Sequence, residues 1–176
     1  ELGILPDMEA YKAQYSSYIR NGIFTQFNRV EFGKKNMEAH MQNRKLIADW
    51  CYEKGLADNV IEKKVRDGKT YFVVNDFEAL RGLFGDLLAE VQRIKSEGDY
   101  EAGKALVETY AVNIDPQLHR EVLDRYASLG LKPYGGFLNP DIVPVEKNGE
   151  VVDYEIVYND DYIAQMLHYG KKYATL

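Results

Sequence analysis

The feature that most constrains the fold is a long apolar stripe between residues 77 and 94. Apolar residues recur there at three- and four-residue steps, which is the repeat of one face of an α-helix. Asp76 precedes the stripe at the position of a helix N-cap. The members of the stripe are Phe77, Leu80, Leu83, Phe84, Leu87, Leu88, Val91 and Ile94. Other parts of the chain must cover this apolar face in the folded protein. With 176 residues, the chain is long enough for one domain of ordinary size, or for two small pieces of a larger protein.

Most of the remaining chain up to residue 130 also has helical patterns. Glycines mark several predicted helix ends, and Asp115 followed by Pro116 is typical of a helix start. Aromatic and β-branched residues at 70–74 predict a strand. The further helices are expected at 6–22, 35–54, 60–68, 99–110 and 115–130, with an irregular link carrying buried phenylalanines at 24–35. We therefore expect residues 1–130 to be mainly helical.

The composition changes after Gly130. Three of the five prolines follow it, and an Asn-Gly turn at 148–149 separates two stretches rich in valine, which is typical of a β-hairpin. Asp160 or Asp161 then opens a last helix. The predicted fold class is mainly α with a small β portion near the C-terminus, and a boundary near Leu131 divides the chain into 1–130 and 131–176.

Charge and hydropathy exclude several classes of function. The net charge of −6 argues against a nucleic-acid partner, because phosphates demand a basic face. No run of 18 apolar residues and no signal peptide is present, so no membrane partner is expected. The single cysteine, Cys51, excludes an internal disulfide and is expected to be a small buried residue.

The search for catalytic motifs leaves one pair of residues. His40, His119 and His168 lie in separate predicted elements without the spacing of a zinc-binding helix, so no self-contained metal site is predicted. Nucleophile-elbow, dinucleotide and phosphate-loop motifs are also lacking. His40 and Arg44, however, are neighbours one turn apart on the predicted helix 35–54.

Two interpretations of this pair remain open from the residues. The predicted helix face carries Met37, His40, Met41, Arg44, Ile47, Ala48 and Cys51, with Lys45, Asp49 and Glu53 on the other side. On such a face the pair could be structural. In a cleft, by contrast, the imidazole could donate to an oxyanion and the guanidinium could hold a carboxylate.

Three blocks resemble the C-terminal third of dipeptidyl-peptidase III, a zinc-dependent exopeptidase family that releases dipeptides from peptide N-termini. They are NMEAHMQNRKLIADWCYEKG, RIKSEGDYEAGKALVETYAV, and FLNPDIVPV with the closing DDYIAQMLHYGKKYA. The resemblance implies a two-lobed fold, with 1–130 in the upper, catalytic lobe and 131–176 in the lower one. It also implies that the zinc motifs of the family, HExxGH and EExxA[DE], lie outside this chain, and it favours a cytoplasmic location.

The resemblance assigns roles to particular residues. His40 matches the family histidine that contacts the substrate carbonyl, Arg44 matches a substrate-binding arginine, and Lys132 could match a basic cleft residue. A second family arginine is not matched, since Asp49 stands there. The chain would therefore bind peptide substrate only together with the rest of the polypeptide and its zinc, and alone it should not hydrolyse peptides.

A different class of function is also consistent with the sequence. The chain has fourteen tyrosines, which suit either buried packing or a protein interface. The alternative is therefore a non-catalytic helical protein-interaction module, in which His40 and Arg44 are structural.

Overall fold

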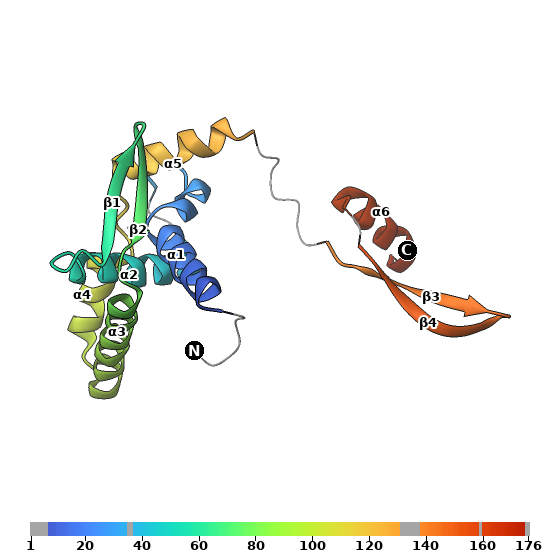
Figure 1. Cartoon of the computed structure of the whole chain (residues 1–176), viewed down its shortest axis with the longest axis horizontal. Helices are drawn as coiled ribbons and strands as arrows, with labels where there is room; N and C mark the ends of the chain where they lie inside the picture. Colours follow the sequence, from blue (N-terminus) through green and yellow to red (C-terminus); the bar gives the residue numbers. More distant parts are fainter. Residues whose placement is uncertain (1–6, 35–36, 131–137, 159, 175–176) are drawn as a thin grey trace. The chain divides into compact units, whose positions relative to one another are not determined.

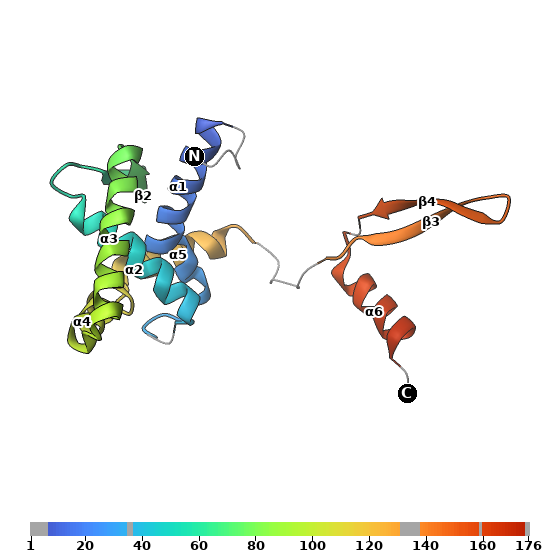
Figure 2. The same cartoon turned by 90° about the horizontal axis from the view of Figure 1, so that it is seen from below.

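The computed structural model describes residues 7–34, 37–130, 138–158 and 160–174. The chain divides into two compact units, Glu1–Gly130 and Leu131–Leu176 (Figures 1 and 2). Helices dominate the described residues, so the predicted mainly helical class is confirmed. The β-structure is not restricted to the C-terminal region, because a hairpin also lies in the first unit.

The first unit is a set of helices with one two-stranded hairpin. Its elements are α1 (Met8–Ile23), the 3₁₀-helix η1 (Thr25–Arg29), α2 (Ala39–Lys54), β1 (Ile61–Arg66), β2 (Lys69–Val74), α3 (Phe77–Glu97), α4 (Tyr100–Tyr110) and α5 (Pro116–Ser128). Aspartates cap the starts of most of these helices. Asp76, as predicted, accepts a hydrogen bond from the Ala79 amide, and Asp115 accepts bonds from two amides of α5.

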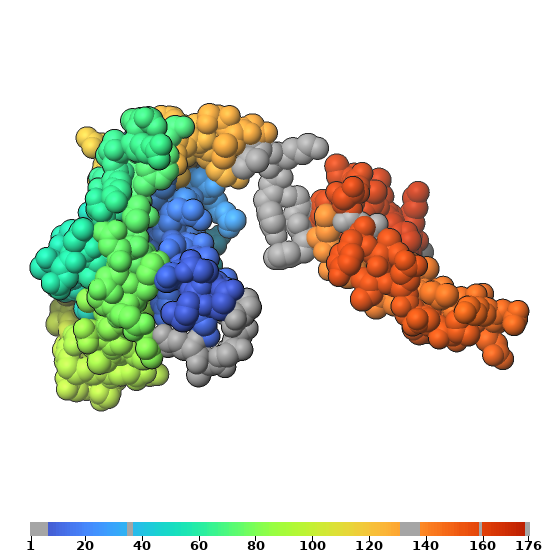
Figure 3. All heavy atoms as spheres, in the orientation of Figure 1, coloured from blue at the N-terminus to red at the C-terminus, as the bar shows by residue number. Residues whose placement is uncertain are grey.

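α2 is the central helix of the first unit, because α1, α3 and α4 all pack against it. The crossing with α1 is close: a Cβ placed on Gly22 would lie 2.5 Å from the Cβ of Ala48. Tyr15 of α1 stacks on Phe84 of α3 with their ring centroids 5.7 Å apart. In the space-filling view, atoms of α1 (blue) lie against atoms of α3 (green) (Figure 3). The apolar stripe of α3 is thus covered by α1 and α2 over only part of its length.

The prediction of a helix at 60–68 is wrong, since these residues form β1 and the turn that follows it. β1 pairs with β2 in an antiparallel hairpin, with Ile61 opposite Val74. Asp67 and Gly68 both have positive φ angles, 51° and 70°, as a two-residue type I′ turn requires. The Asp-Gly dipeptide was therefore the hairpin signal in this stretch, and the strand predicted at 70–74 is confirmed.

The second unit contains a hairpin of β3 (Asp141–Lys147) and β4 (Glu150–Val157), followed by α6 (Tyr162–Tyr173). The predicted Asn-Gly turn and terminal helix are confirmed, and Asp161 is the cap of that helix. The buried side chain of Gln165 exchanges two hydrogen bonds, of 2.6 and 3.0 Å, with the backbone of Asn139. Among the described residues, no helix is long and apolar enough to cross a membrane.

Candidate functional site

His40 lies in the first turn of α2 and is exposed. Glu38 occupies the N-cap position but gives no side-chain hydrogen bond to the helix. Within the described ranges, His40 has no hydrogen-bond or ion-pair partner. Among the described residues, His40 is therefore not a buried, hydrogen-bonded core histidine, and its proposed contact with substrate stays a prediction.

Arg44 follows His40 by one helical turn and is half-buried beside α1. Its backbone carbonyl would lie 2.6 Å from a Cβ on Gly22, so the backbone at this position is fixed by the helix crossing. Its charge acts on Tyr18. Burial raises the pKa of the Tyr18 hydroxyl, and the positive charge of Arg44 offsets part of that rise. Arg44 has no ion-pair partner in the described part of the chain, which leaves its charge open to an external carboxylate.

The predicted division of the α2 surface is partly wrong. Lys45, placed on the polar side from the sequence, is only 3% exposed and belongs to the buried face with Met41, Ala48 and Cys51. Its ammonium group pairs with Asp49 and donates a hydrogen bond to the Tyr110 carbonyl, at 3.1 Å. The error arises because α4 packs on this side of α2, a long-range contact that residue spacing cannot reveal.

Asp49, the residue that departs from the family pattern, is the partner of Lys45. Burial raises the pKa of its carboxyl group, while the neighbouring lysine opposes that shift. Asp49 therefore helps to hold α4 on α2. Lys132, the third predicted site residue, lies outside the described residues.

The remaining predicted candidates occupy separate positions. Cys51 is fully buried, as expected, and burial raises the pKa of its thiol to about 12. His119 is also buried, and its Nε2 is 2.8 Å from the carbonyl oxygen of Val30. His168 lies on α6 in the second unit. Among the described residues, no group of histidine, cysteine and acidic side chains could hold a metal ion.

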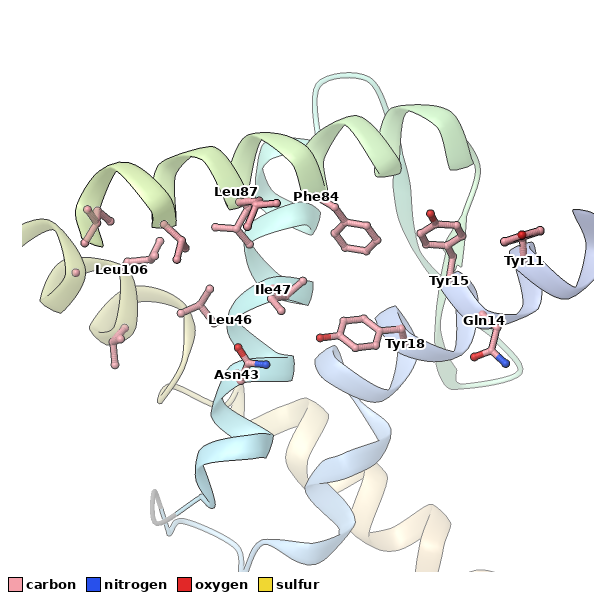
Figure 4. A pocket seen from close by; sticks show the side chains of 15 residues that line it. Tyr11, Gln14, Tyr15, Tyr18, Asn43, Leu46, Ile47, Phe84, Leu87 and Leu106 are labelled. Carbon is pink, nitrogen blue, oxygen red and sulfur yellow. The ribbon is translucent and has the colours of Figure 1, made fainter. Parts of the chain in front are cut away.

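A second feature of the first unit was not predicted from the sequence. An apolar groove of about 800 Å³ runs between α1, α2, α3 and α4 (Figure 4). Tyrosines of α1 line one part of it, Leu46 and Ile47 of α2 lie at its base, and aliphatic residues of α3 and α4 line the rest. The signal in the sequence was the stripe of α3, whose member Leu88 remains 59% exposed.

The groove approaches the His40 and Arg44 positions along α2. Asn43, which lines the groove, follows His40 by three residues and directly precedes Arg44. Tyr18, which also lines the groove, is the residue on which the charge of Arg44 acts. No protein-family model matches this chain, and no curated protein matches it.

Proposed function

We propose that this chain supplies the substrate-binding part of a zinc dipeptidyl-peptidase of the dipeptidyl-peptidase III type, which releases dipeptides from peptide N-termini. The observation that carries the proposal is the exposed His40 imidazole, without a partner among the described residues and one helical turn before Arg44. The resemblance of the sequence blocks adds the reaction class. The resemblance implies that the zinc ligands belong to polypeptide outside this chain, and the described residues contain no group of side chains that could hold a metal ion.

In this proposal the two side chains have different tasks. The His40 imidazole donates a hydrogen bond to the substrate carbonyl oxygen, and this bond strengthens as negative charge develops there. The Arg44 guanidinium holds a substrate carboxylate through paired hydrogen bonds. Because His40 is exposed, its replacement should affect the reaction more than the fold.

The test is the variant His40→Ala in the complete polypeptide. Loss of one donor to the oxyanion should lower kcat by roughly 10²-fold with little change in KM. Zinc content, measured by elemental analysis, should stay at the wild-type level. His168→Ala, which changes another exposed histidine, is the matched control and should retain the wild-type kcat.

An unchanged kcat in His40→Ala would remove the proposed role of the imidazole. Loss of zinc together with activity would also count against it, because His40 would then support the metal site. The 176-residue chain alone provides a second check. Peptide hydrolysis by that chain would contradict the assignment of the metal ligands to polypeptide outside it.

A second candidate function is a non-catalytic protein-interaction module, and the hairpin of the second unit favours it. On one face of this hairpin Ile142 lies opposite Ile156, and Pro144 lies opposite Tyr154, with all four residues largely exposed or half-exposed. An apolar strand face of this kind is a site for pairing with another protein. A partner identified by affinity capture should be lost with Ile156→Ser and retained with Val65→Ser, a strand position of β1 that is also largely exposed.

A further inference from the structure

The hairpin of the first unit has outward-facing backbone groups on both of its strands. In a hairpin with a two-residue turn, the pair that closes the turn, here Arg66 and Lys69, exchanges both of its backbone hydrogen bonds. Such pairs alternate along antiparallel strands. The N–H and C=O groups of Thr70 therefore point away from β1, and those of Lys63 and Val65 point away from β2.

The outer edge of β2 is covered by the protein itself. The Thr70 amide donates a hydrogen bond to a carboxylate oxygen of Glu121, at 2.7 Å, and the Thr70 carbonyl accepts one from the Arg125 guanidinium, at 2.8 Å. Both partners are side chains of α5. α1 also packs against β2 (Figure 1). The outward backbone groups of Thr70 are thus already paired.

The outer edge of β1 has no such cover. Residues 63–66 are all exposed, and Val65 keeps 70% of its accessible surface. Among the residues that the structure describes, no group outside the hairpin forms a hydrogen bond with the outward N–H or C=O of Lys63 or Val65. A row of unpaired backbone groups on an exposed strand is a template for one more strand. The shape of the site therefore selects an extended chain.

The side chains of this hairpin are mainly basic, although the whole chain carries a net charge of −6. Residues 61–69 include four basic side chains, Lys63, Lys64, Arg66 and Lys69, and two acidic ones, Glu62 and Asp67. The Glu62 carboxylate is already engaged, because it accepts a hydrogen bond from Asn75 and pairs with Lys64 at 3.0 Å. Lys63 and Lys69 have no ion pair within the described ranges. A chain beside β1 would therefore meet an excess of positive charge.

The alternation of β1 defines which residues of an added strand would meet this charge. Lys64 and Arg66 lie on one face of the hairpin, and Lys63 and Val65 lie on the other. In an antiparallel partner, the residue opposite each of them shares its face, with Cβ atoms about 5 Å apart. Acidic residues opposite the three basic ones, and an apolar residue opposite Val65, would form favourable cross-strand pairs. Read from the N-terminus of the partner, this order is acidic, apolar, acidic, acidic.

We propose that β1 is a docking edge for an acidic, extended segment of another protein, which adds to the hairpin as a third, antiparallel strand. Backbone hydrogen bonds to Lys63 and Val65 hold the segment, and the basic side chains of β1 select its acidic sequence. Lysines on an exposed edge also keep neutral strands from pairing with it, an effect that an acidic partner overcomes. This site is independent of the proposed peptidase function, because it requires neither zinc nor His40.

The test uses the 176-residue chain, labelled with nitrogen-15, and the end-capped peptide Glu-Val-Glu-Glu-Gln. An NMR titration should show saturable shifts of the Lys63 and Val65 amide signals. The peptide Lys-Val-Lys-Lys-Gln has the same length and the opposite charge, so it should bind at least about fivefold more weakly. Equal affinity of the two peptides would overturn the proposal. Without saturable binding of the acidic peptide, the lysines would only protect the edge, and the proposal would fail.

A modified peptide tests whether binding is strand addition rather than attraction between charges. Methylation of the valine backbone nitrogen removes the donor to the Val65 carbonyl and leaves every charge in place. The affinity of the acidic peptide should then fall by about fivefold or more. An unchanged affinity would show that the peptide is not added as a strand.

Val65→Pro tests the other hydrogen bond of the same pair. Proline removes the outward N–H of position 65, which the pairing of β1 with β2 does not use, so the hairpin should be retained. The amide signals of Tyr71 and Val73, which take part in the pairing, report whether it is. Binding of the acidic peptide should weaken by about fivefold or more. Unchanged affinity with an intact hairpin would refute the proposal, and the methylated peptide decides the question if the hairpin is lost.

A charge exchange tests the register of the added strand. Lys63→Glu should weaken binding of Glu-Val-Glu-Glu-Gln and strengthen binding of Glu-Val-Glu-Lys-Gln, whose lysine lies opposite position 63, by about two- to fivefold each. Lys69→Glu is the matched control, because it makes the same charge change at an exposed position of β2. This control should change the two affinities in the same direction. If Lys63→Glu does the same, the peptide does not lie along β1 as proposed.

Discussion

Replacement of Lys45 by methionine tests whether the buried ion pair of α2 stabilises the first unit. The side chain of Lys45 is 4% exposed and that of Asp49 is 29% exposed. Methionine has a similar length and fills the same space, but it leaves Asp49 without its counter-ion and the Tyr110 carbonyl without its donor. The variant therefore removes the charge and keeps most of the apolar packing.

The expected loss of stability follows from the exposure of the two partners. Removal of one partner from a fully buried pair costs about 3–5 kcal/mol. Asp49 keeps part of its contact with water, so its uncompensated charge costs less than that. We expect the free energy of unfolding to fall by about 2–3 kcal/mol, which corresponds to a urea midpoint about 1–2 M lower for a protein of ordinary urea sensitivity.

Urea unfolding followed by tryptophan fluorescence is a suitable assay. Trp50 is the only tryptophan and directly follows Asp49 on α2, so its signal reports on the first unit. Lys12→Met is the control, since Lys12 pairs with Glu9 on the surface and should contribute at most about 0.5 kcal/mol. A midpoint for Lys45→Met no lower than that of the control would refute the reasoning.

The pH dependence of the same variant has a defined sign. Burial raises the pKa of Asp49 in the folded chain, and Lys45 opposes this shift. Without Lys45 the pKa rises further, so the folded state holds the proton more tightly than the unfolded state. Stability then increases as the pH falls through the folded pKa. The difference between Lys45→Met and wild type should therefore be smaller at pH 4.5 than at pH 7.

Further predictions concern the packing around α2. Gly22→Ala should lower the free energy of unfolding by about 1–3 kcal/mol, because its Cβ would lie 2.5 Å from the Cβ of Ala48 and 2.6 Å from the Arg44 carbonyl oxygen. Gly85→Ala, in open space on α3, should instead raise it by up to about 1 kcal/mol in the same urea assay. The Cys51 thiol, whose pKa is raised to about 12, should resist a thiol-specific disulfide reagent at pH 8 until the chain is unfolded; rapid reaction of the native chain would contradict its burial.

Local signals in the sequence predicted much of the second unit and most helix boundaries. The Asn-Gly turn at 148–149 and the Asp115 cap depend on a few adjacent residues, so their patterns are sufficient. The first strand of the hairpin at 61–74 was predicted as a helix, because Lys63 and Lys64 interrupt the alternation of apolar and polar residues that is typical of a strand. Its Asp67-Gly68 turn was the stronger signal, since both residues adopt the positive φ angles that a type I′ turn requires.

Long-range packing explains what the sequence could not predict around the site. α2 is covered by three other helices, so the apolar side of its pattern does not identify the whole buried surface. Lys45 is buried only because Asp49 and the end of α4 satisfy its charge. The groove likewise depends on where α4 crosses α3, which leaves Leu88 exposed although it belongs to the apolar stripe.

The position of His40 at the start of α2 separates its role from the stability of the fold. Packing by the other helices is concentrated on the buried face that includes Met41 and Ala48, whereas His40 is exposed in the first turn. His40→Ala should therefore change the free energy of unfolding by less than about 0.5 kcal/mol, the usual limit for surface substitutions. A large loss of activity with unchanged stability would assign His40 to substrate contact, whereas equal losses of both would make it a structural residue.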